Sequence, residues 1–155
     1  MIRPTKPGDT SAILPIFLSV LHAHADTAPT HFKQSSDATS LSSWLTGILS
    51  DPRAISLVAV EGDTILGYLF GLEIRKEESP IRPPMHYLSL EHVAVLPTHR
   101  LRGIATALVA ALLSEAKARN ISRIALDVWS FNRPAQRFFA RHGFNELRQH
   151  LEADV

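Results

Sequence analysis

Arg100-Leu101-Arg102-Gly103-Ile104-Ala105 is a short basic turn that connects a predicted strand to a predicted helix. Residues 88–95 before it are largely apolar and read as a strand, which Pro97 ends because proline has no backbone N–H to donate. Residues 104–119 after it carry apolar side chains three and four positions apart, the spacing of one helix face. The stretch therefore predicts a strand, a turn and a helix in that order, as in domains that combine helices with a sheet.

The same turn has the properties of a phosphate-binding site. The first backbone N–H groups of a helix have no acceptor within the helix, and the helix dipole adds partial positive charge there. Gly103 leaves room for a ligand to approach the backbone, and Arg100 and Arg102 can add charge-assisted hydrogen bonds. A glycine that only begins the helix is the alternative. The sequence has no G-x-x-x-x-G-K-[ST] loop and no G-x-G-x-x-G turn after a strand, so Walker-type and Rossmann-type sites have no support.

The turn fits the pattern [Q/R]-x-x-G-x-[G/A] and follows Val93-Ala94-Val95-Leu96-Pro97. A second block, Asn132-x-x-Ala135-x-x-Phe138-Phe139-x-x-x-Gly143-Phe144, follows a predicted strand over residues 124–128. Together, and in this order, the two blocks resemble the acyl-coenzyme-A-binding turn and the C-terminal signature of the GCN5-related N-acetyltransferase (GNAT) family. The opening Ile2-Arg3-Pro4 is also similar to the start of that family's chains.

The resemblance implies an α/β (α+β) fold with a mixed, twisted sheet of six or seven strands and about four helices. It also implies that two central parallel strands, residues 88–95 and 124–128, splay apart and hold the pantetheine arm of acetyl-CoA between them. Asn132 would contact that arm or simply cap the last helix. The implied cofactor-binding residues are Val93, Ala94, Val95, Arg100, Leu101, Arg102, Gly103, Ile104, Ala105, Thr106, Asn132, Ala135 and Phe138.

Composition limits the classes of protein to which the chain can belong. The 155 residues suit one domain, 1–155, and a net charge of +1 gives no general attraction to nucleic acid. No apolar run is long enough to cross a bilayer, and no signal peptide is recognisable at the N-terminus. The absence of cysteine excludes disulfides and thiolate metal sites and is consistent with a cytoplasmic protein. His22 and His24 are two positions apart, which does not suit a metal site on a helix, so we expect no metal.

Other elements follow from apolar spacing and turn residues. We expect Asp9 or Ser11 to cap a first helix, with Pro15 making that helix start late or kink. Gly143 should end the last helix before a strand that starts at Phe144. The remaining expectations are a strand over residues 1–5, a helix over 41–49 that Asp51-Pro52 ends, strands over 55–60 and 65–74 joined by a turn at 61–64, and a loop over 76–84.

The reaction implied by the resemblance is transfer of an acetyl group from acetyl-CoA to a primary amine, by direct attack in a ternary complex. An alkyl amine has a pKa near 10, so only about one molecule in a thousand is nucleophilic at pH 7, a deficit of about 4 kcal/mol that a general base helps to recover. Glu91 is the leading base, on the side of Val93 and Val95 by alternation. If the strand is bulged, His92 turns inward instead, with a near-neutral pKa.

The general acid is less well defined. Many family members have a tyrosine where this chain has Phe139, which cannot protonate a departing thiolate. A non-catalytic acyl-CoA-binding sensor or partner module of the same fold is therefore the alternative function. The acceptor, a small-molecule or peptide amine, would be selected by residues 13–49 and the loop at 76–84. Strand edges near the C-terminus would allow a homodimer.

Overall fold

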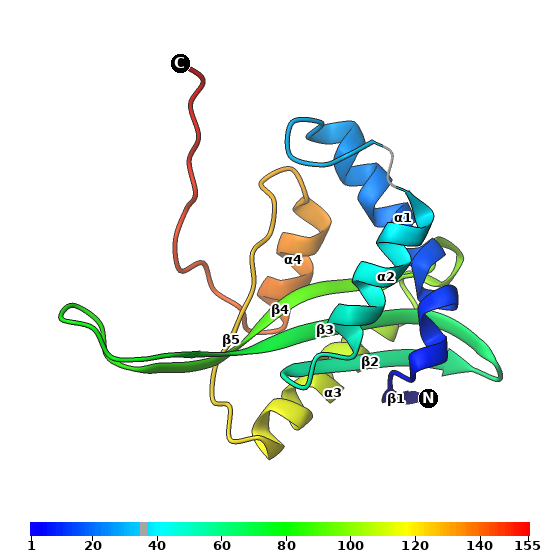
Figure 1. Ribbon diagram of the computed structural model, residues 1–155, viewed down its shortest axis with the longest axis horizontal. Helices are drawn as coiled ribbons and strands as arrows, with labels where there is room; N and C mark the ends of the chain where they lie inside the picture. Colours follow the sequence, from blue (N-terminus) through cyan, green and yellow to red (C-terminus); the bar gives the residue numbers. More distant parts are fainter. Residues whose placement is uncertain (35–36) are drawn as a thin grey trace.

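A computed structural model describes residues 1–34 and 37–155, and these form a mixed sheet flanked by helices (Figure 1). The strands lie in sequence order, β1-β2-β3-β4-β5. The first four are antiparallel to their neighbours, and β5 is parallel to β4. Their bounds are β1 Ile2–Pro4, β2 Ala54–Glu61, β3 Thr64–Lys76, β4 Met85–Val95 and β5 Ile124–Ala125. The expected α+β class is confirmed, but the described residues contain five strands rather than six or seven.

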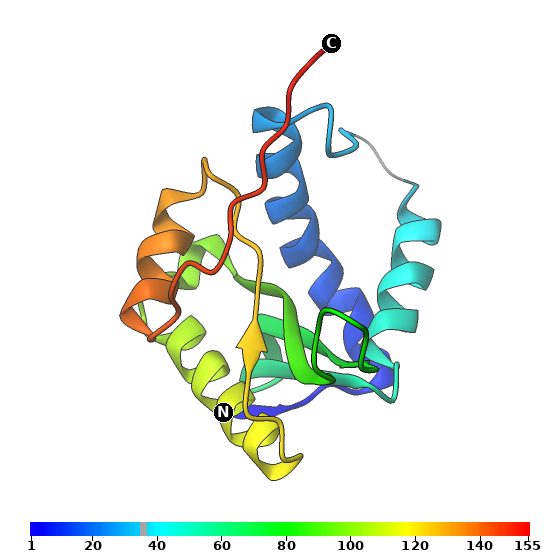
Figure 2. The ribbon, with the colours of Figure 1, turned by 90° about the vertical axis from the view of Figure 1, so that its left-hand side faces the viewer.

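Two helices cover each face of the sheet, as Figure 2 shows with the sheet between them. On one face lie α1 (Thr10–Thr27) and α2 (Ala38–Leu49), and on the other α3 (Ile104–Ala118) and α4 (Arg133–Arg141). The α3–α4 face packs mainly aliphatic side chains such as Leu69, Leu88 and Leu112. The α1–α2 face packs Ile13, Phe17, Tyr68 and Phe70. Alternate residues of β3 therefore enter different cores, which is why Tyr68 and Leu69 are both fully buried.

The first helix differs from the sequence expectation. It begins at Thr10, so Pro15 lies inside it rather than in its first turn. Ile13 and Ile16, on either side of the proline, are fully buried. Their packing stabilises this segment and offsets the missing backbone hydrogen bond. Asp9 precedes the helix but makes no side-chain cap to it. Its carboxylate instead accepts hydrogen bonds from the backbone N–H of Lys6 and from the Arg3 guanidinium, which lowers the pKa of Asp9.

Turn and loop expectations are confirmed for the middle of the chain. Gly62, at φ 56°, occupies the left-handed region in the turn between β2 and β3. Asp37 caps α2 by accepting a hydrogen bond from the backbone N–H of Ser40 at 2.7 Å. Residues 77–84 form the connection at the tip of the long β3–β4 hairpin, which projects from the rest of the molecule in Figure 1.

The expected strand from Phe144 is wrong. Residues 144–155 contain no helix or strand, and all of them except Phe144 are exposed. The segment extends away from α4 toward the C-terminus in both ribbon views (Figures 1 and 2). Extended backbone becomes a strand only when a neighbouring strand pairs with it, and none of the described residues provides one for this segment. The tail is therefore extended but unpaired.

The predicted strand over residues 124–128 is also shorter than expected. Pairing between β4 and β5 is limited to Leu88 with Ile124 and Ser89 with Ala125. Beyond that point β4 continues to Val95 with no strand beside it on this edge. The two parallel strands therefore part after one short ladder, which agrees with the splay implied by the resemblance.

Candidate functional site

The candidate site lies where β4 and β5 diverge and is bounded at one end by the turn that begins α3. Residues 90–95 of β4 pair only with β3, so the opposite backbone edge is left open for another partner. The chain leaves β4 at Val95, passes through a 3₁₀ turn at Pro97–His99, and reaches α3 at Ile104. The helix therefore starts near the carboxyl end of the strand whose edge is open.

The backbone of this turn leaves several N–H groups without a hydrogen-bond partner among the described residues. Leu101 (φ 62°) and Gly103 (φ 79°) both adopt left-handed conformations, and Leu101 is fully exposed. Ala107 is the first residue whose N–H bonds back, to the Gly103 carbonyl at 2.9 Å. Among the described residues, the N–H groups of residues 101–106 find no protein acceptor. Unpartnered N–H groups of this kind can donate to an anion, and the phosphate-binding role of the turn stays a prediction.

The two arginines of the turn differ in environment. Arg100 donates from Nε to the Val95 carbonyl at 3.3 Å, so its guanidinium lies against the end of β4. Arg102 is exposed and makes no hydrogen bond or ion pair with the described residues. Positive charge at a helix N-terminus is unfavourable with the helix dipole unless an anion lies nearby. Val93, Ala94 and Val95 line the open stretch of β4, with Ala94 and Val95 buried.

A β-bulge separates the two candidate bases. Gly71 of β3 pairs with Leu90, and Phe70 pairs with His92, so Glu91 is the extra residue with no partner. The expected simple alternation that placed Glu91 with Val93 and Val95 is therefore wrong. The extra residue shifts the phase of the strand: Leu90 belongs to the aliphatic core, whereas His92 faces the α1–α2 side. Glu91 is exposed, and His92 turns inward as the bulged alternative requires.

His92 lies within a group of aromatic rings. Its ring stacks on Phe17 at a centroid distance of 5.0 Å and lies parallel to Tyr68 and Phe70 at 5.4 and 5.9 Å. Its Nδ1 is 2.7 Å from the hydroxyl of Tyr68. Burial in this apolar group lowers the pKa of His92 to about 4, with a smaller contribution from the positive charge of His24. Burial also raises the pKa of Tyr68, so the phenol keeps its proton.

The Tyr68–His92 hydrogen bond determines which ring nitrogen of His92 carries the proton. The Tyr68 side chain is fully buried, and Nδ1 of His92 is its hydrogen-bond partner among the described residues. The protonated phenol therefore donates to Nδ1, because a buried O–H without an acceptor costs about 1–3 kcal/mol. In the neutral imidazole the proton then resides on Nε2. His92 presents a hydrogen-bond donor at Nε2 rather than a free basic nitrogen.

A second group of rings was not found by sequence reasoning. Phe32 contacts both His24 and Trp129, with centroid distances of 5.1 Å in each case, and Phe131 lies 5.5 Å from His24. These residues come from α1, the segment after it and the connection from β5 to α4. The contacts join segments about a hundred residues apart, so no local spacing could have revealed them.

The second sequence block contributes mainly structure. Asn132 Oδ1 accepts from the Ala135 N–H at 3.2 Å and caps α4, which is the structural one of its two predicted roles. Phe139 is buried in the aliphatic core between Phe138 and Phe144, at centroid distances of 5.1 and 5.4 Å. Ala135 and Phe138 are partly buried against the same core. The position of Phe139 offers no proton donor.

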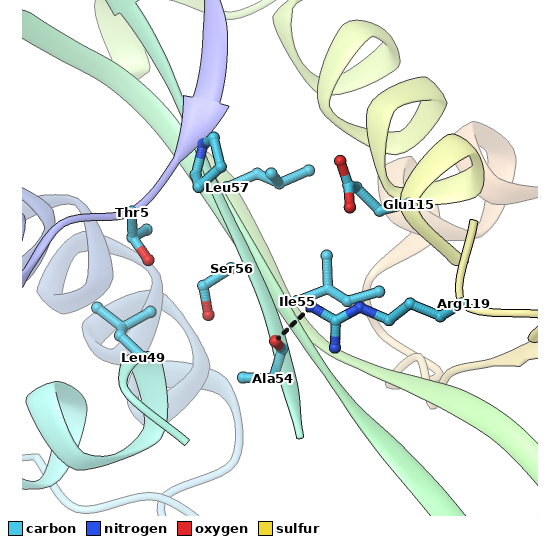
Figure 3. A pocket seen from close by; sticks show the side chains of 9 residues that line it. Thr5, Leu49, Ala54, Ile55, Ser56, Leu57, Glu115 and Arg119 are labelled. Atoms are coloured by element: carbon cyan, nitrogen blue, oxygen red, sulfur yellow. Dashed lines mark hydrogen bonds between the residues drawn. The ribbon is translucent and has the colours of Figure 1, made fainter. Parts of the chain in front are cut away.

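A separate pocket, drawn in Figure 3, lies elsewhere on the molecule. It has a volume of about 190 Å³ and is lined by Leu49 and Thr5 on one side and by Glu115 and Arg119 on the other. Arg119 follows the last residue of α3, so the pocket is at the opposite end of that helix from the basic turn. No helix in the described part of the chain is long and apolar enough to span a membrane.

Comparison with known proteins agrees with this geometry. A family model described as the Acetyltransferase (GNAT) family matches residues 17–144. An uncharacterized N-acetyltransferase of Mycobacterium tuberculosis is 32% identical over 117 residues, which cover 76% of this chain and 69% of the relative, and a counterpart in Mycobacterium bovis matches equally. The chain therefore belongs to the GNAT acetyltransferase family.

Solved structures share the fold. The BH1408 protein of Bacillus halodurans, as a tetramutant, has a TM-score of 0.93 at 24% identity, over 100% of this chain and 99% of its own. A predicted acetyltransferase of Clostridium acetobutylicum, crystallised with acetyl-CoA, has a TM-score of 0.75 at 22% identity, over 99% and 95%. An aminoglycoside 6'-N-acetyltransferase of Acinetobacter haemolyticus has a TM-score of 0.76 at 20% identity, over 100% and 97%.

Proposed function

We propose that this protein transfers the acetyl group of acetyl-CoA to a primary amine of a small molecule or peptide, by direct attack in a ternary complex. The observation that carries the proposal is the run of unpartnered N–H groups over residues 101–106 at the open edge of β4. A diphosphate would accept from these N–H groups, and Arg102 would add a charge-assisted hydrogen bond. The acetyl-CoA in the Clostridium structure belongs to a protein of the same fold and supports this choice of cosubstrate.

The open edge of β4 suits the rest of the cosubstrate. Its amides would pair with backbone groups of residues 90–95, which have no strand beside them. Acetyl-CoA supplies the thioester carbon that the amine attacks. The residues assigned to hold it are those of β4 and of the α3 turn, namely Val93, Ala94, Val95, Arg100, Leu101, Arg102, Gly103, Ile104, Ala105 and Thr106, together with Asn132, the cap of α4, and Ala135 and Phe138 within α4.

We assign the general base to Glu91. Its carboxylate is exposed in the stretch of β4 that β5 leaves uncovered, so it can take a proton from an amine directly or through water. His92 is poorly suited to that task, because Tyr68 occupies its free lone pair and its pKa is lowered to about 4. Its Nε2–H would instead donate a hydrogen bond in the site. The thiolate would leave with a proton from water, since Phe139 cannot supply one.

The acceptor would lie on the α1–α2 side, between His92 and the ring group of His24, Phe32, Trp129 and Phe131. His24 belongs to α1, the same helix whose Phe17 stacks on His92. Trp129 is 38% exposed, so it can contact a bound molecule. Replacing it (Trp129→Ala) should raise KM for the acceptor and leave the affinity for coenzyme A unchanged. A change of cofactor affinity alone would contradict this placement.

The experiment that tests the function follows free thiol release from acetyl-CoA over a panel of primary amines. Release that depends on an amine supports the transferase. The alternative, a non-catalytic acyl-CoA-binding module, is favoured by one observation, the phenylalanine at position 139. Tight binding of acetyl-CoA with no release on any amine would support that alternative. Thermal stabilisation by ATP or NAD rather than by coenzyme A would contradict both.

A further inference from the structure

The ring group of His24, Phe32, Trp129 and Phe131 is a closed set of contacts at the surface. Phe32 and Phe131 each contact both His24 and Trp129, with ring centroids between 5.1 and 5.7 Å apart. None of the four side chains is fully buried, and Trp129 is 38% exposed. A single exposed apolar side chain is ordinary, whereas a contiguous exposed group is typical of a surface that binds an apolar partner.

Hydrogen bonds hold the segments that carry these rings. Gln34 Nε2 donates to the Ala25 carbonyl at 3.1 Å and joins the segment after α1 to that helix. Gln136 Nε2 donates to the carbonyls of Trp129 and Ser130 at 3.0 and 3.1 Å and joins the connection from β5 to α4. The rings are therefore in place before a ligand binds, so a flat apolar group can pack on them without the cost of ordering these segments.

His24 adds one polar group to this apolar surface. Its Nδ1 lies 2.8 Å from the Val20 carbonyl oxygen, which can only accept, so Nδ1 carries the proton of the neutral imidazole. Its Nε2 then keeps a lone pair, which is the opposite tautomer from that of His92. The ring group can therefore accept a hydrogen bond from an N–H or O–H of a bound molecule.

The carboxylates near the ring group are either paired or on another face. Glu152 accepts a hydrogen bond from His31 at 2.8 Å, and Asp127 lies 4.0 Å from an arginine of the C-terminal tail. Asp26 is two positions from His24, which places it on a different face of α1. A polycationic acceptor such as a polyamine needs free carboxylates, so the charges favour an acceptor with an apolar end.

The first helix sets the distance between the ring group and His92. Phe17 stacks on His92 at 5.0 Å, and His24 follows Phe17 by seven positions on α1. Seven residues make two helical turns, so the two side chains share one face of the helix, roughly 10 Å apart along its axis. Glu91 precedes His92 on β4, so an acceptor with its amine near Glu91 has the ring group within reach of its other end.

We propose that the acceptor is a primary amine with an aromatic ring at the other end of an alkyl chain. The amine lies at Glu91, the aromatic ring packs on Trp129 and Phe32, and an N–H or O–H on that ring donates to Nε2 of His24. This inference rests on the proposed function, because it names the class of amine that the same site acetylates.

The first test compares acceptors on the native enzyme. Thiol release gives kcat/KM for phenylalkylamines with two, four or six methylenes and for n-alkylamines with the same chain lengths. A phenyl group should raise kcat/KM by about tenfold once the chain is long enough to reach the rings. Equal values for the two series at every length would overturn the inference and leave the transferase function standing. Release with no amine at all would contradict the function itself.

The second test removes the proposed aromatic contact. Trp129→Ala should lower kcat/KM for the phenylalkylamines to that of the matched alkylamines, whereas Trp129→Phe should keep most of the difference. The control is Leu113→Ala, which removes a 45% exposed apolar side chain from α3 and should keep all of it. Circular dichroism checks that each variant is folded. A folded Trp129→Ala variant with the native preference for phenylalkylamines would overturn the inference.

The third test concerns the lone pair of His24. A para-hydroxyl on the phenyl ring should raise kcat/KM further in the native enzyme, because the hydroxyl can donate to Nε2. His24→Phe keeps a ring at this position but has no lone pair, so the gain from the hydroxyl should disappear. The same gain in both proteins would show that His24 does not accept this hydrogen bond.

Discussion

The two faces of the sheet are built from different kinds of side chain. The face beneath α3 and α4 is aliphatic, apart from Phe139 and its aromatic neighbours, and its packing follows from helical and strand spacing in the sequence. The face beneath α1 and α2 contains Tyr68, Phe70 and His92 in a stack that a β-bulge creates. One face therefore depends on local periodicity, whereas the other depends on a register shift between two strands.

The difference extends to the roles that we propose. The α3 turn depends on backbone N–H groups, a left-handed glycine and two arginines, and all of these are encoded within a few consecutive residues. The α1–α2 side needs rings from α1 and β3 to meet around His92 on β4. A change in the first region should act on cofactor affinity, and a change in the second on turnover, acceptor selection or the pH dependence of stability. The following predictions test this division.

The largest effect is expected for Glu91→Gln in the bulge. Loss of the base should reduce turnover at neutral pH by about 10²- to 10³-fold, with a smaller loss at high pH where the amine is already deprotonated. Steady-state rates from pH 6 to 10 measure this, with Glu61→Gln at the exposed end of β2 as the control. The same ratio at every pH would remove Glu91 as the base.

The next effect concerns the basic turn. The double variant Arg100→Ala/Arg102→Ala should weaken coenzyme A binding by roughly 100-fold, because about 1.5 kcal/mol is lost for each charge-assisted hydrogen bond. Neither guanidinium is part of a core, so the melting temperature should change little. Calorimetric titration measures the affinity. The control is Arg141→Ala, which removes an exposed arginine from the far end of α4. Equal affinity in both variants would contradict the phosphate role.

The third effect concerns the ring stack around His92, which should make the stability of the fold depend on pH. Because the pKa of His92 is lowered from 6.5 to about 4 in the folded state, the unfolded chain binds a proton more readily over that range. The free energy of unfolding therefore contains the full contribution of neutral His92 above pH 6.5. This contribution falls as the pH decreases toward 4, by an amount on the order of 2 kcal/mol by pH 4.5.

Replacement of His92 by Phe should make the free energy of unfolding depend less on pH in this range. Denaturant unfolding between pH 7 and 4.5 measures it, and the carboxylates that begin to titrate near pH 4.5 are common to the variant and the native chain. His22→Phe, at an exposed position of α1, is the control and should leave the slope unchanged. An unaltered slope in His92→Phe would show that the imidazole is not buried in its neutral form.

The smallest effect is expected at the helix start. Gly103 adopts φ 79°, so Gly103→Ala should reduce the free energy of unfolding by about 1 kcal/mol through backbone strain. No atom lies within 4 Å of the position that a Cβ would occupy, so a steric clash contributes nothing. Chemical denaturation measures the change, with Gly8→Ala, which is equally open and has no positive φ, as the control. A larger loss for Gly8→Ala would contradict the argument from φ.

Much of the architecture could be predicted from local pattern. The order of strands and helices, the turn at Gly62 and the helix start after Gly103 each depend on residues close together in sequence. Errors arose where a distant partner decides the outcome. The helix does not start late at Pro15, because Ile13 and Ile16 pack α1 on the sheet, and Phe144 begins no strand because none of the described residues pairs with it. The bulge at Glu91 was left open as an alternative, since its presence depends on the register against Gly71.

The sequence by itself determined the family and the two blocks that bracket the candidate site, and it predicts a phosphate-binding turn, because these depend on the spacing of neighbouring residues. The tertiary structure alone decided which of Glu91 and His92 faces solvent, which nitrogen of His92 carries its proton, and which rings surround it. Those properties arise when Phe17, Tyr68 and Phe70 exclude water from an imidazole, and exclusion of water depends on contacts between segments that are far apart in the chain.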